Sequence, residues 1–259
     1  MFMQKAVEVK GREEIAAMRR AGAVAGAILE RLRGLVAPGL TTGEIDSIAR
    51  EELKKRGAKP AFLNYHGFPA VICVSINHEV VHGIPSDKRA LAEGDIVGLD
   101  FGAVVDRFYG DCAVTVGVGR VSPEAERLMR VTRESLERGI AAVKAGARVG
   151  DIGAAVQTHA EGAGYGVVRD FVGHGIGRAL HEEPPIPNFG KPGTGPRLKS
   201  GMTIAIEPMV NAGGIEVETL SDGWTAVTKD RKLSAHFEHT VLVTEEGADI
   251  LTLPDAKIS

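Results

Sequence analysis

Two aspartates, Asp100 and Asp111, lie in adjoining apolar, β-branched stretches that a short polar break at Asp106 and Arg107 separates. This pattern predicts two strands joined as a hairpin. A turn centred between Val105 and Asp106 would make the aspartates cross-strand partners on one face, with Cβ atoms about 5 Å apart. Two carboxylates that close in a water-poor site cannot both stay ionised without a cation. The pair therefore indicates a metal site, whereas an offset turn with one aspartate in solvent would make it accidental.

Three side chains in the second half could complete such a site. His174 stands between two glycines, whose missing side chains would let its imidazole approach an ion. Glu207 precedes Pro208, which ends a predicted strand, so its side chain can point into a cleft. Glu238 lies within the predicted strand AHFEHTVLV, where an unpaired carboxylate is costly.

This set of four carboxylates and one imidazole has a clear chemical preference. Oxygen-rich ligands with one nitrogen are typical of a site for one or two divalent ions such as Mn, Fe, Co or Zn. They are not typical of a structural zinc site, which is rich in cysteine. Four carboxylates carry enough charge to balance two dications, and two ions about 3.5 to 4 Å apart that share a water form a hydrolytic site.

The elements that would position these residues can be predicted from periodicity and end signals. Apolar spacing predicts an amphipathic helix over residues 12 to about 35. The Thr-x-x-Glu capping box at residues 41–44 begins a second helix, which Gly57 ends. A serine and a proline begin a third helix over 122–143, and Asp151 caps a fourth.

The two halves of the chain resemble each other at an offset of 107 positions. Asp100 falls on Glu207 at this offset, so each half carries a carboxylate at an equivalent point. The other matches are Gly39 with Gly146, Gly43 with Gly150, Glu44 with Asp151 and Ile45 with Ile152. A helix, helix, strands unit is therefore predicted to occur twice.

Composition excludes several classes of protein. The 259 residues include 31 basic and 34 acidic side chains, a formal charge of −3, whereas a nucleic-acid-binding protein would be strongly basic. We expect a cytoplasmic protein, because the sequence shows neither a signal peptide nor a segment long enough to span a membrane. Cys73 and Cys112 are too few and too far apart for a disulfide framework or a zinc ribbon.

Five segments together give the chain a resemblance to the bacterial, type I methionine aminopeptidases. They are YHGFPAVICVSINHEVVHGIP, LDFGAVVDRFYGDCAVTV, FVGHGIGRALHEEPPIPNFG, GMTIAIEPMV and FEHTVLV. The resemblance implies the pita-bread α+β fold, a curved antiparallel sheet with helices on its outer face and an internal pseudo-twofold. We expect a single catalytic domain over 1–259, with pseudo-repeats at approximately 12–118 and 119–250.

The resemblance also implies a reaction, the removal of N-terminal methionine from proteins and peptides whose second residue is small. The metal ligands it implies are Asp100, Asp111, His174, Glu207 and Glu238, which would hold two divalent ions of Co, Mn, Fe, Zn or Ni. Glu207 would be the general base, His181 would face the carbonyl oxygen and His82 the scissile nitrogen. Both histidines would contact substrate, and the methionine pocket would consist of Phe62, Tyr65, His66, Phe68, Cys73 and Trp224.

Some implications concern departures, a further ion and partners. Phe62 and Leu180 stand where bacterial relatives often have Cys and Phe, so the resemblance does not define the shape of the pocket. Asn77, Glu79 and Ser234 lie where relatives bind a monovalent cation. The implied partners are polypeptides that begin with Met, with the ribosome as a further candidate, for a monomer that binds neither nucleic acid nor membrane.

Two alternatives stay open from the sequence. An aminopeptidase P or prolidase-like enzyme would use the same ligands on Xaa-Pro bonds. A non-catalytic binding protein could keep the fold and lose the reaction. Cleavage rates on Met-Ala and Ala-Pro peptides separate the first alternative, and metal titration separates the second.

Overall fold

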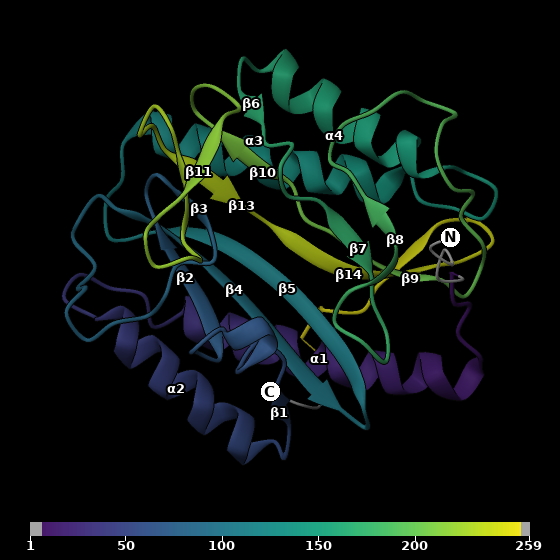
Figure 1. The fold of residues 1–259 in the computed structure, drawn as a ribbon, viewed down its shortest axis with the longest axis horizontal. Helices are drawn as coiled ribbons and strands as arrows, with labels where there is room; N and C mark the ends of the chain where they lie inside the picture. Colours follow the sequence, from purple (N-terminus) through teal and green to yellow (C-terminus); the bar gives the residue numbers. More distant parts are fainter. Residues whose placement is uncertain (1–6, 255–259) are drawn as a thin grey trace.

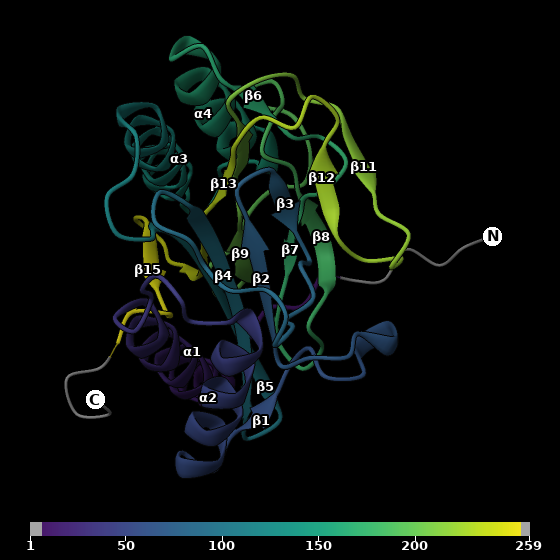
Figure 2. The ribbon, with the colours of Figure 1, turned by 90° about the vertical axis from the view of Figure 1, so that its left-hand side faces the viewer.

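The computed structural model describes residues 7–254, and its helices lie together on one side of a curved sheet (Figures 1 and 2). The helices are α1 (Arg12–Arg33), α2 (Thr42–Lys55), α3 (Pro123–Ala141) and α4 (Val149–Gly162), with a 3₁₀ turn η1 at Tyr65–Gly67. The first two pack near the strands of the first half, and α3 and α4 near those of the second (Figure 1).

The main sheet is antiparallel, in the order β1-β4-β5-β14-β9-β7-β8, with β2 also paired to β4 and β15 to β14. Its strands are β1 (Lys59–Pro60), β2 (Ile72–Ile76), β4 (Ile96–Val105), β5 (Phe108–Gly117), β7 (Gly173–Gly175), β8 (Glu182–Ile186), β9 (Thr203–Ile206), β14 (Glu238–Val243) and β15 (Ala248–Ile250). The predicted α+β class with a curved antiparallel sheet is confirmed.

Two smaller antiparallel sheets adjoin the main one. One contains β6 (Gly166–Val167), β10 (Met209–Asn211) and β13 (Ser234–His236), and the other contains β3 (Glu79–Val81), β11 (Val217–Thr219) and β12 (Ala226–Thr228). Within residues 7–254, no helix has both the length and the apolar character that crossing a membrane requires.

Small residues let α1 lie against backbone. A Cβ added at Gly22 would clash with the carbonyl oxygen of Leu251, and one added at Gly26 would clash with that of Thr252. The two glycines therefore let α1 pack closely against the chain that follows β15. One hydrophobic cluster joins α1 and α2 to β2 and β4, while another joins α3 and α4 to β9.

The predicted caps of α2 and α3 are present, with Ser122 as the N-cap of α3, whereas the predicted cap of α4 differs. Thr41 caps α2 and forms the predicted capping box with Glu44. The prediction that Asp151 caps α4 is wrong, because Arg148 is the N-cap and Asp151 lies in the first turn. The Asp151 carboxylate accepts the Arg148 backbone N–H at 2.7 Å, as the Glu44 carboxylate accepts that of Thr41.

The offset of 107 recurs in the contacts of the turns before α2 and α4. The N–H of Gly39 donates to the carbonyl of Leu91, and the N–H of Gly146 donates to that of Leu198. Isolated bridges join Thr41 to Ala90 and Arg148 to Arg197, again 107 positions apart.

The β4–β5 hairpin has a different register from the predicted one. Asp100 pairs with Ala113 and Gly102 pairs with Asp111, so the two aspartates are diagonal neighbours. The turn residues are Asp106 and Arg107, both with positive φ as in a type I′ turn. Since the partner moves by two residues, both aspartates keep the same face.

The predicted strand AHFEHTVLV is two strands. It is interrupted at Phe237, where β13 ends and β14 begins. The neighbouring chain is interrupted at the same level, because Glu207 and Pro208 separate β9 from β10. Pro208 has no N–H to donate, so the ladder of backbone hydrogen bonds is interrupted in both neighbouring segments.

Candidate metal centre

The five predicted ligands come from five consecutive strands of the main sheet. Asp100 is on β4, Asp111 on β5, Glu238 on β14 and His174 on β7, while Glu207 directly follows β9. The strand register aligns these residues across the sheet. Ala113 pairs with both Asp100 and Glu238, and His239 pairs with Ile206. Since side chains alternate between faces, this register directs the carboxylates to one face of the sheet.

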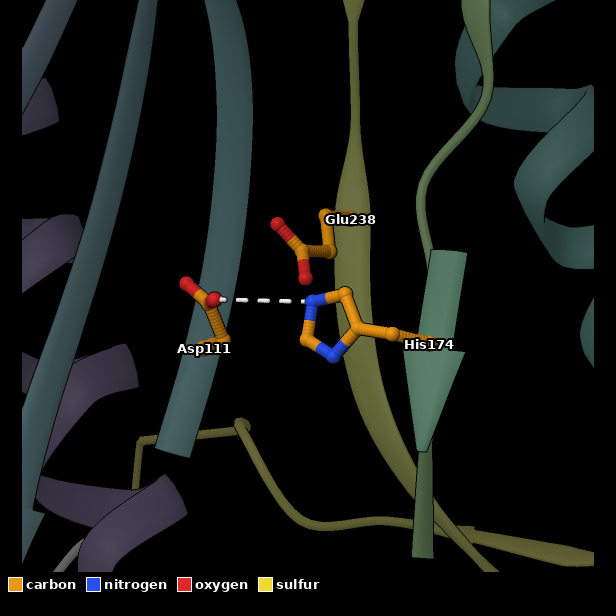
Figure 3. Close-up of side chains that lie close together, drawn as sticks. All are labelled: Asp111, His174 and Glu238. Atoms are coloured by element: carbon orange, nitrogen blue, oxygen red, sulfur yellow. Dashed lines mark ion pairs between the residues drawn. The ribbon is translucent and has the colours of Figure 1, made fainter. Parts of the chain in front are cut away.

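The side chains of Asp111, His174 and Glu238 point toward one another (Figure 3). One ligand atom from each lies within 4.8 Å of the others, the spacing of groups that could share an ion. His174 Nε2 is 4.0 Å from Asp111 Oδ2 and 3.5 Å from Glu207 Oε1. Its Nδ1 lies 2.9 Å from the Gly175 carbonyl, to which it can donate, which leaves the Nε2 lone pair for a metal.

Polar atoms without partners give an independent test of whether a cation fits. Among the described residues, buried oxygens of Asp100, Asp111 and Glu238 have no hydrogen-bond partner. Burying an ionised carboxylate without a compensating charge costs on the order of several kcal/mol of desolvation free energy. A divalent cation bound between them would supply the missing partner, and the oxygen-rich donor set is the one that such ions prefer.

Burial and mutual repulsion determine the charge of this cluster. Burial, and then the charge of Asp111, raises the pKa of Asp100 well above its usual range. The pKa values of Glu207 and Glu238 are raised for the same two reasons. Burial lowers the pKa of His174 to about 3. Without a cation, the site therefore retains protons on carboxylates and keeps His174 neutral at pH 7.

A cavity of about 210 Å³ contains these ligands and the residues predicted to contact substrate. It is lined by Phe62, Tyr65, His66, Phe68, Cys73, His82, Asp100, Asp111, His174, Leu180, His181, Glu207, Trp224 and Glu238. Phe62, Phe68, Cys73 and Leu180 are buried, so one end of the cavity is apolar. A volume below the roughly 300 Å³ of drug-sized sites suits a single side chain and its backbone.

Aromatic contacts hold the imidazoles at the border of this cavity. His181 Nδ1 lies 2.7 Å from the Tyr65 hydroxyl, and its ring meets that of His174 edge-on with centroids 4.3 Å apart. His82 contacts Trp224 edge-on, and Trp224 packs in the same way on Phe68. Burial, and then the charge of His181, lowers the pKa of His82 to about 4, so it is neutral at pH 7.

The residues predicted to bind a monovalent cation have other contacts. Both carboxylate oxygens of Glu79 lie 2.7 Å from Arg89 Nη2. The carbonyl of Asn77 accepts the N–H of Ser234 at 2.8 Å. The prediction of a cation at this point thus stays a prediction, and it would depend on backbone oxygens.

Two residues near the ligands were not identified from the sequence as site residues. His236 Nε2 is buried without a hydrogen-bond partner, 3.9 Å from Glu207 Oε2. Asn188 is fully buried and donates to the Glu207 carbonyl at 3.1 Å. The spacing of His236, two residues before Glu238 on the same face, could have indicated it. Nothing local in the sequence links Asn188 to Glu207.

Comparison with known proteins identifies the class to which this fold and site belong. The model of metallopeptidase family M24 matches residues 16–245. The chain therefore belongs to metallopeptidase family M24.

Relatives within that family narrow the assignment. Methionine aminopeptidase A of Synechocystis is 53% identical over 251 residues, which are 97% of this chain and 99% of the relative. The crystal structure of methionine aminopeptidase from Thermotoga maritima is 48% identical, with a TM-score of 0.94, and the match covers 96% of this chain and all of that one. Within the family, the chain belongs with the bacterial type I methionine aminopeptidases.

A more distant structure shows what the fold alone shares. Prolidase from Pyrococcus furiosus is 26% identical with a TM-score of 0.76, and the match covers 95% of this chain but 66% of the prolidase. The pita-bread fold is therefore common to both groups, and the prolidase has additional sequence outside the shared part.

Proposed function

We propose that this chain hydrolyses the peptide bond after an N-terminal methionine, in substrates whose second residue is small, with two divalent ions held by five side chains. The observation that carries the proposal is the convergence of Asp100, Asp111, His174, Glu207 and Glu238 on one cavity. Membership of the methionine aminopeptidase group supports the choice of methionine.

Charge balance supports two ions. Four ionised carboxylates carry a charge of about −4, which one dication would leave half compensated in a buried site. Asp111 and Glu238 lie between Asp100 on one side and His174 with Glu207 on the other, so the five side chains together would hold two ions. When bound, such ions supply Lewis acidity, which polarises a carbonyl and lowers the pKa of water to near 7.

The protein's own residues would hold and move the protons. Glu207 would be ionised once bound cations compensate the neighbouring carboxylates, and it could then accept a proton from the attacking water and release it to the leaving amine. His181 lies at the border of the cavity, where a ring N–H can donate to the carbonyl oxygen as negative charge develops on it. His82, which lines the same cavity and packs on Trp224, would hydrogen-bond the scissile nitrogen.

The apolar end of the cavity would select the first substrate residue. Phe62, Phe68, Cys73, Leu180 and Trp224 surround it, and an unbranched thioether fills irregular apolar space well. The cavity volume of about 210 Å³ supports a small second residue beside the histidines.

The substrates in the cell would be proteins and peptides that begin with Met, and we place their cleavage in the cytoplasm. Contact with the ribosome is a further prediction from the family resemblance. Neither nucleic acid nor membrane is needed for the proposed reaction.

A metal reconstitution experiment tests the proposal. Protein stripped of metal should regain cleavage of a Met-Ala-Ser peptide as Co, Mn, Fe, Zn or Ni is added, and calorimetry should count two ions for full activity. Asp111→Asn should weaken divalent binding by about tenfold or more, because it removes a charged metal ligand. Faster cleavage of an Ala-Pro peptide would favour a prolidase-like enzyme, and tight metal binding without cleavage of either peptide would favour a binding protein.

A further inference from the structure

A buried lysine lies next to the site but does not line its cavity. Lys10 precedes α1, and its backbone N–H donates to the Gly201 carbonyl at 2.8 Å. Only 3% of its side chain is exposed. An ammonium group is rarely buried to this degree and is costly there unless it is paired. Lys10 also falls before residues 16–245, the part that the family model matches.

The nearer partner of Lys10 is the residue that follows His181, while the exposed Glu8 Oε2 lies farther away, at 3.5 Å. Lys10 Nζ lies 2.5 Å from Glu182 Oε2, whose side chain is 13% exposed. The second oxygen, Glu182 Oε1, accepts the backbone N–H of Ala179 at 3.1 Å. One carboxylate thus joins the N-terminal segment to the middle of the short connection that precedes β8.

This connection, residues 176–181, is folded around the ion pair. A Cβ added at Gly177 would lie 2.5 Å from Lys10 Cε and 2.7 Å from Glu182 Oε1, so a side chain at this position would displace the pair. The Gly177 N–H donates to the Ala179 carbonyl, and the Gly177 carbonyl accepts the N–H of Tyr109. The pair therefore fills the space that the loop encloses.

The same connection links the two imidazoles that face each other in the cavity. It begins after His174 on β7 and ends at His181, whose ring is perpendicular to that of His174 within 7°. The cavity side of His181 is fixed by Tyr65, whereas its backbone is fixed by the adjacent Glu182. His181 itself is exposed, so packing alone does not determine its position.

We propose that the Lys10–Glu182 ion pair is a positioning device that holds His181 at the scissile carbonyl. This inference deepens the proposed function and depends on it for the role of His181. Lys10 is not a catalytic residue, because it contacts neither the cavity nor the ligands. Its effect passes through Glu182 and the loop that the carboxylate closes.

A double-mutant cycle with His181→Ala tests the proposal. Lys10→Met keeps the length of the side chain and removes its charge. We expect kcat to fall by about 10- to 100-fold, the range for a displaced catalytic group, with KM and metal content within about twofold of the parent. In the His181→Ala background the same change should alter kcat by less than about twofold, because the imidazole through which Lys10 affects kcat is absent. Lys199→Met, at an exposed lysine, is the matched control and should leave kcat unchanged.

A second variant and a second readout keep the test decisive. Lys10→Met with Glu182→Gln leaves no buried charge, so it should fold if the single variant does not, and it should show the same loss in kcat. In metal-free protein labelled with ¹⁵N-histidine, Lys10→Met should shift or broaden the His181 ring signals and spare those of His82. An equal loss of kcat in both backgrounds, unchanged kcat, or unaltered His181 signals would overturn the proposal. A wild-type protein that cleaves no Met peptide would instead refute the proposed function, and the ring signals would still decide whether the pair positions His181.

Discussion

Under the proposed function, the contact between Tyr65 and His181 would decide which nitrogen of His181 carries the proton. The Tyr65 hydroxyl lies 2.7 Å from His181 Nδ1, and a tyrosine hydroxyl can donate to that nitrogen. Although part of the His181 side chain reaches solvent, partial desolvation of its ring, and then the charge of His66, lowers the pKa of His181, so the ring is neutral near pH 7 and has one proton to place. When Nδ1 accepts, the proton is on Nε2, which is the tautomer that an oxyanion donor needs.

His181→Ala should therefore lower kcat by about 100-fold or more while metal content stays at the wild-type level. Tyr65→Phe should lower kcat less, by roughly tenfold, because the imidazole stays in place and only the bias toward one tautomer is lost. Steady-state kinetics on a Met-Ala peptide with metal analysis of each variant measures both effects. A Tyr65→Phe loss as large as that of His181→Ala would show that Tyr65 acts on substrate directly.

Residues whose chemistry conflicts with their local pattern were the predictable ones. Asp100 and Asp111 could be found because aspartate is rare inside strands, and Glu238 because it interrupts an apolar strand. Lys10 could not be found, since a lysine before a helix is ordinary and its partner is 172 positions away. Only the folded chain shows that its amine is buried.

The β4–β5 hairpin shows how far a pattern determines register. Alternation identified both strands and the polar break, and a wrong turn centre still kept both aspartates on one face. The turn itself was misplaced because its residues, Asp106 and Arg107, lack the glycine that usually marks a type I′ turn. The break at Phe237 was missed because its cause, Pro208, lies on the neighbouring strand.

Because Arg107 has a backbone conformation that favours glycine, we expect glycine at this position to be more stable than alanine. Arg107 has φ of +68°, a conformation that costs a side chain roughly 1 kcal/mol and costs glycine little. Arg107→Gly should therefore be more stable than Arg107→Ala by about 1 kcal/mol in the free energy of unfolding. Both variants remove the same long side chain and keep the ion pair between Arg20 and Asp106, so the pair of variants isolates the backbone effect. Urea denaturation of metal-loaded protein measures the difference, and equal midpoints would mean that the turn is unstrained.

The two halves of the molecule contribute unequally to the centre they share. The first half supplies Asp100 and Asp111, and the second supplies His174, Glu207 and Glu238. Bringing these groups together without a cation places like charges in a buried space, so the folded chain carries a local instability that a bound cation would relieve. This instability should depend on pH in a direction that the pKa shifts determine.

Between about pH 7 and 8.5, we expect metal-free protein to lose stability as the pH rises. The pKa values of Asp100, Glu207 and Glu238 are raised on folding, so the native state binds more protons than the unfolded chain does, and unfolding becomes easier as these protons leave. Buried imidazoles act in the opposite direction, since burial lowers the pKa of His174 and His236 to about 3, but their contribution ends near the ordinary value of 6.5. Above pH 7 the carboxylates dominate, with a slope of up to about 1.4 kcal/mol per pH unit for each retained proton.

Melting temperatures of metal-free and Mn-loaded protein across this range measure the effect. The metal-free curve should fall and the loaded curve should stay level, because a bound dication replaces the protons. Asp111→Asn removes one interacting carboxylate and should flatten the metal-free curve without added metal. A metal-free protein whose melting temperature rises from pH 7 to 8.5 would mean that the carboxylates are already ionised, and hence that their charges are compensated by groups of the protein itself.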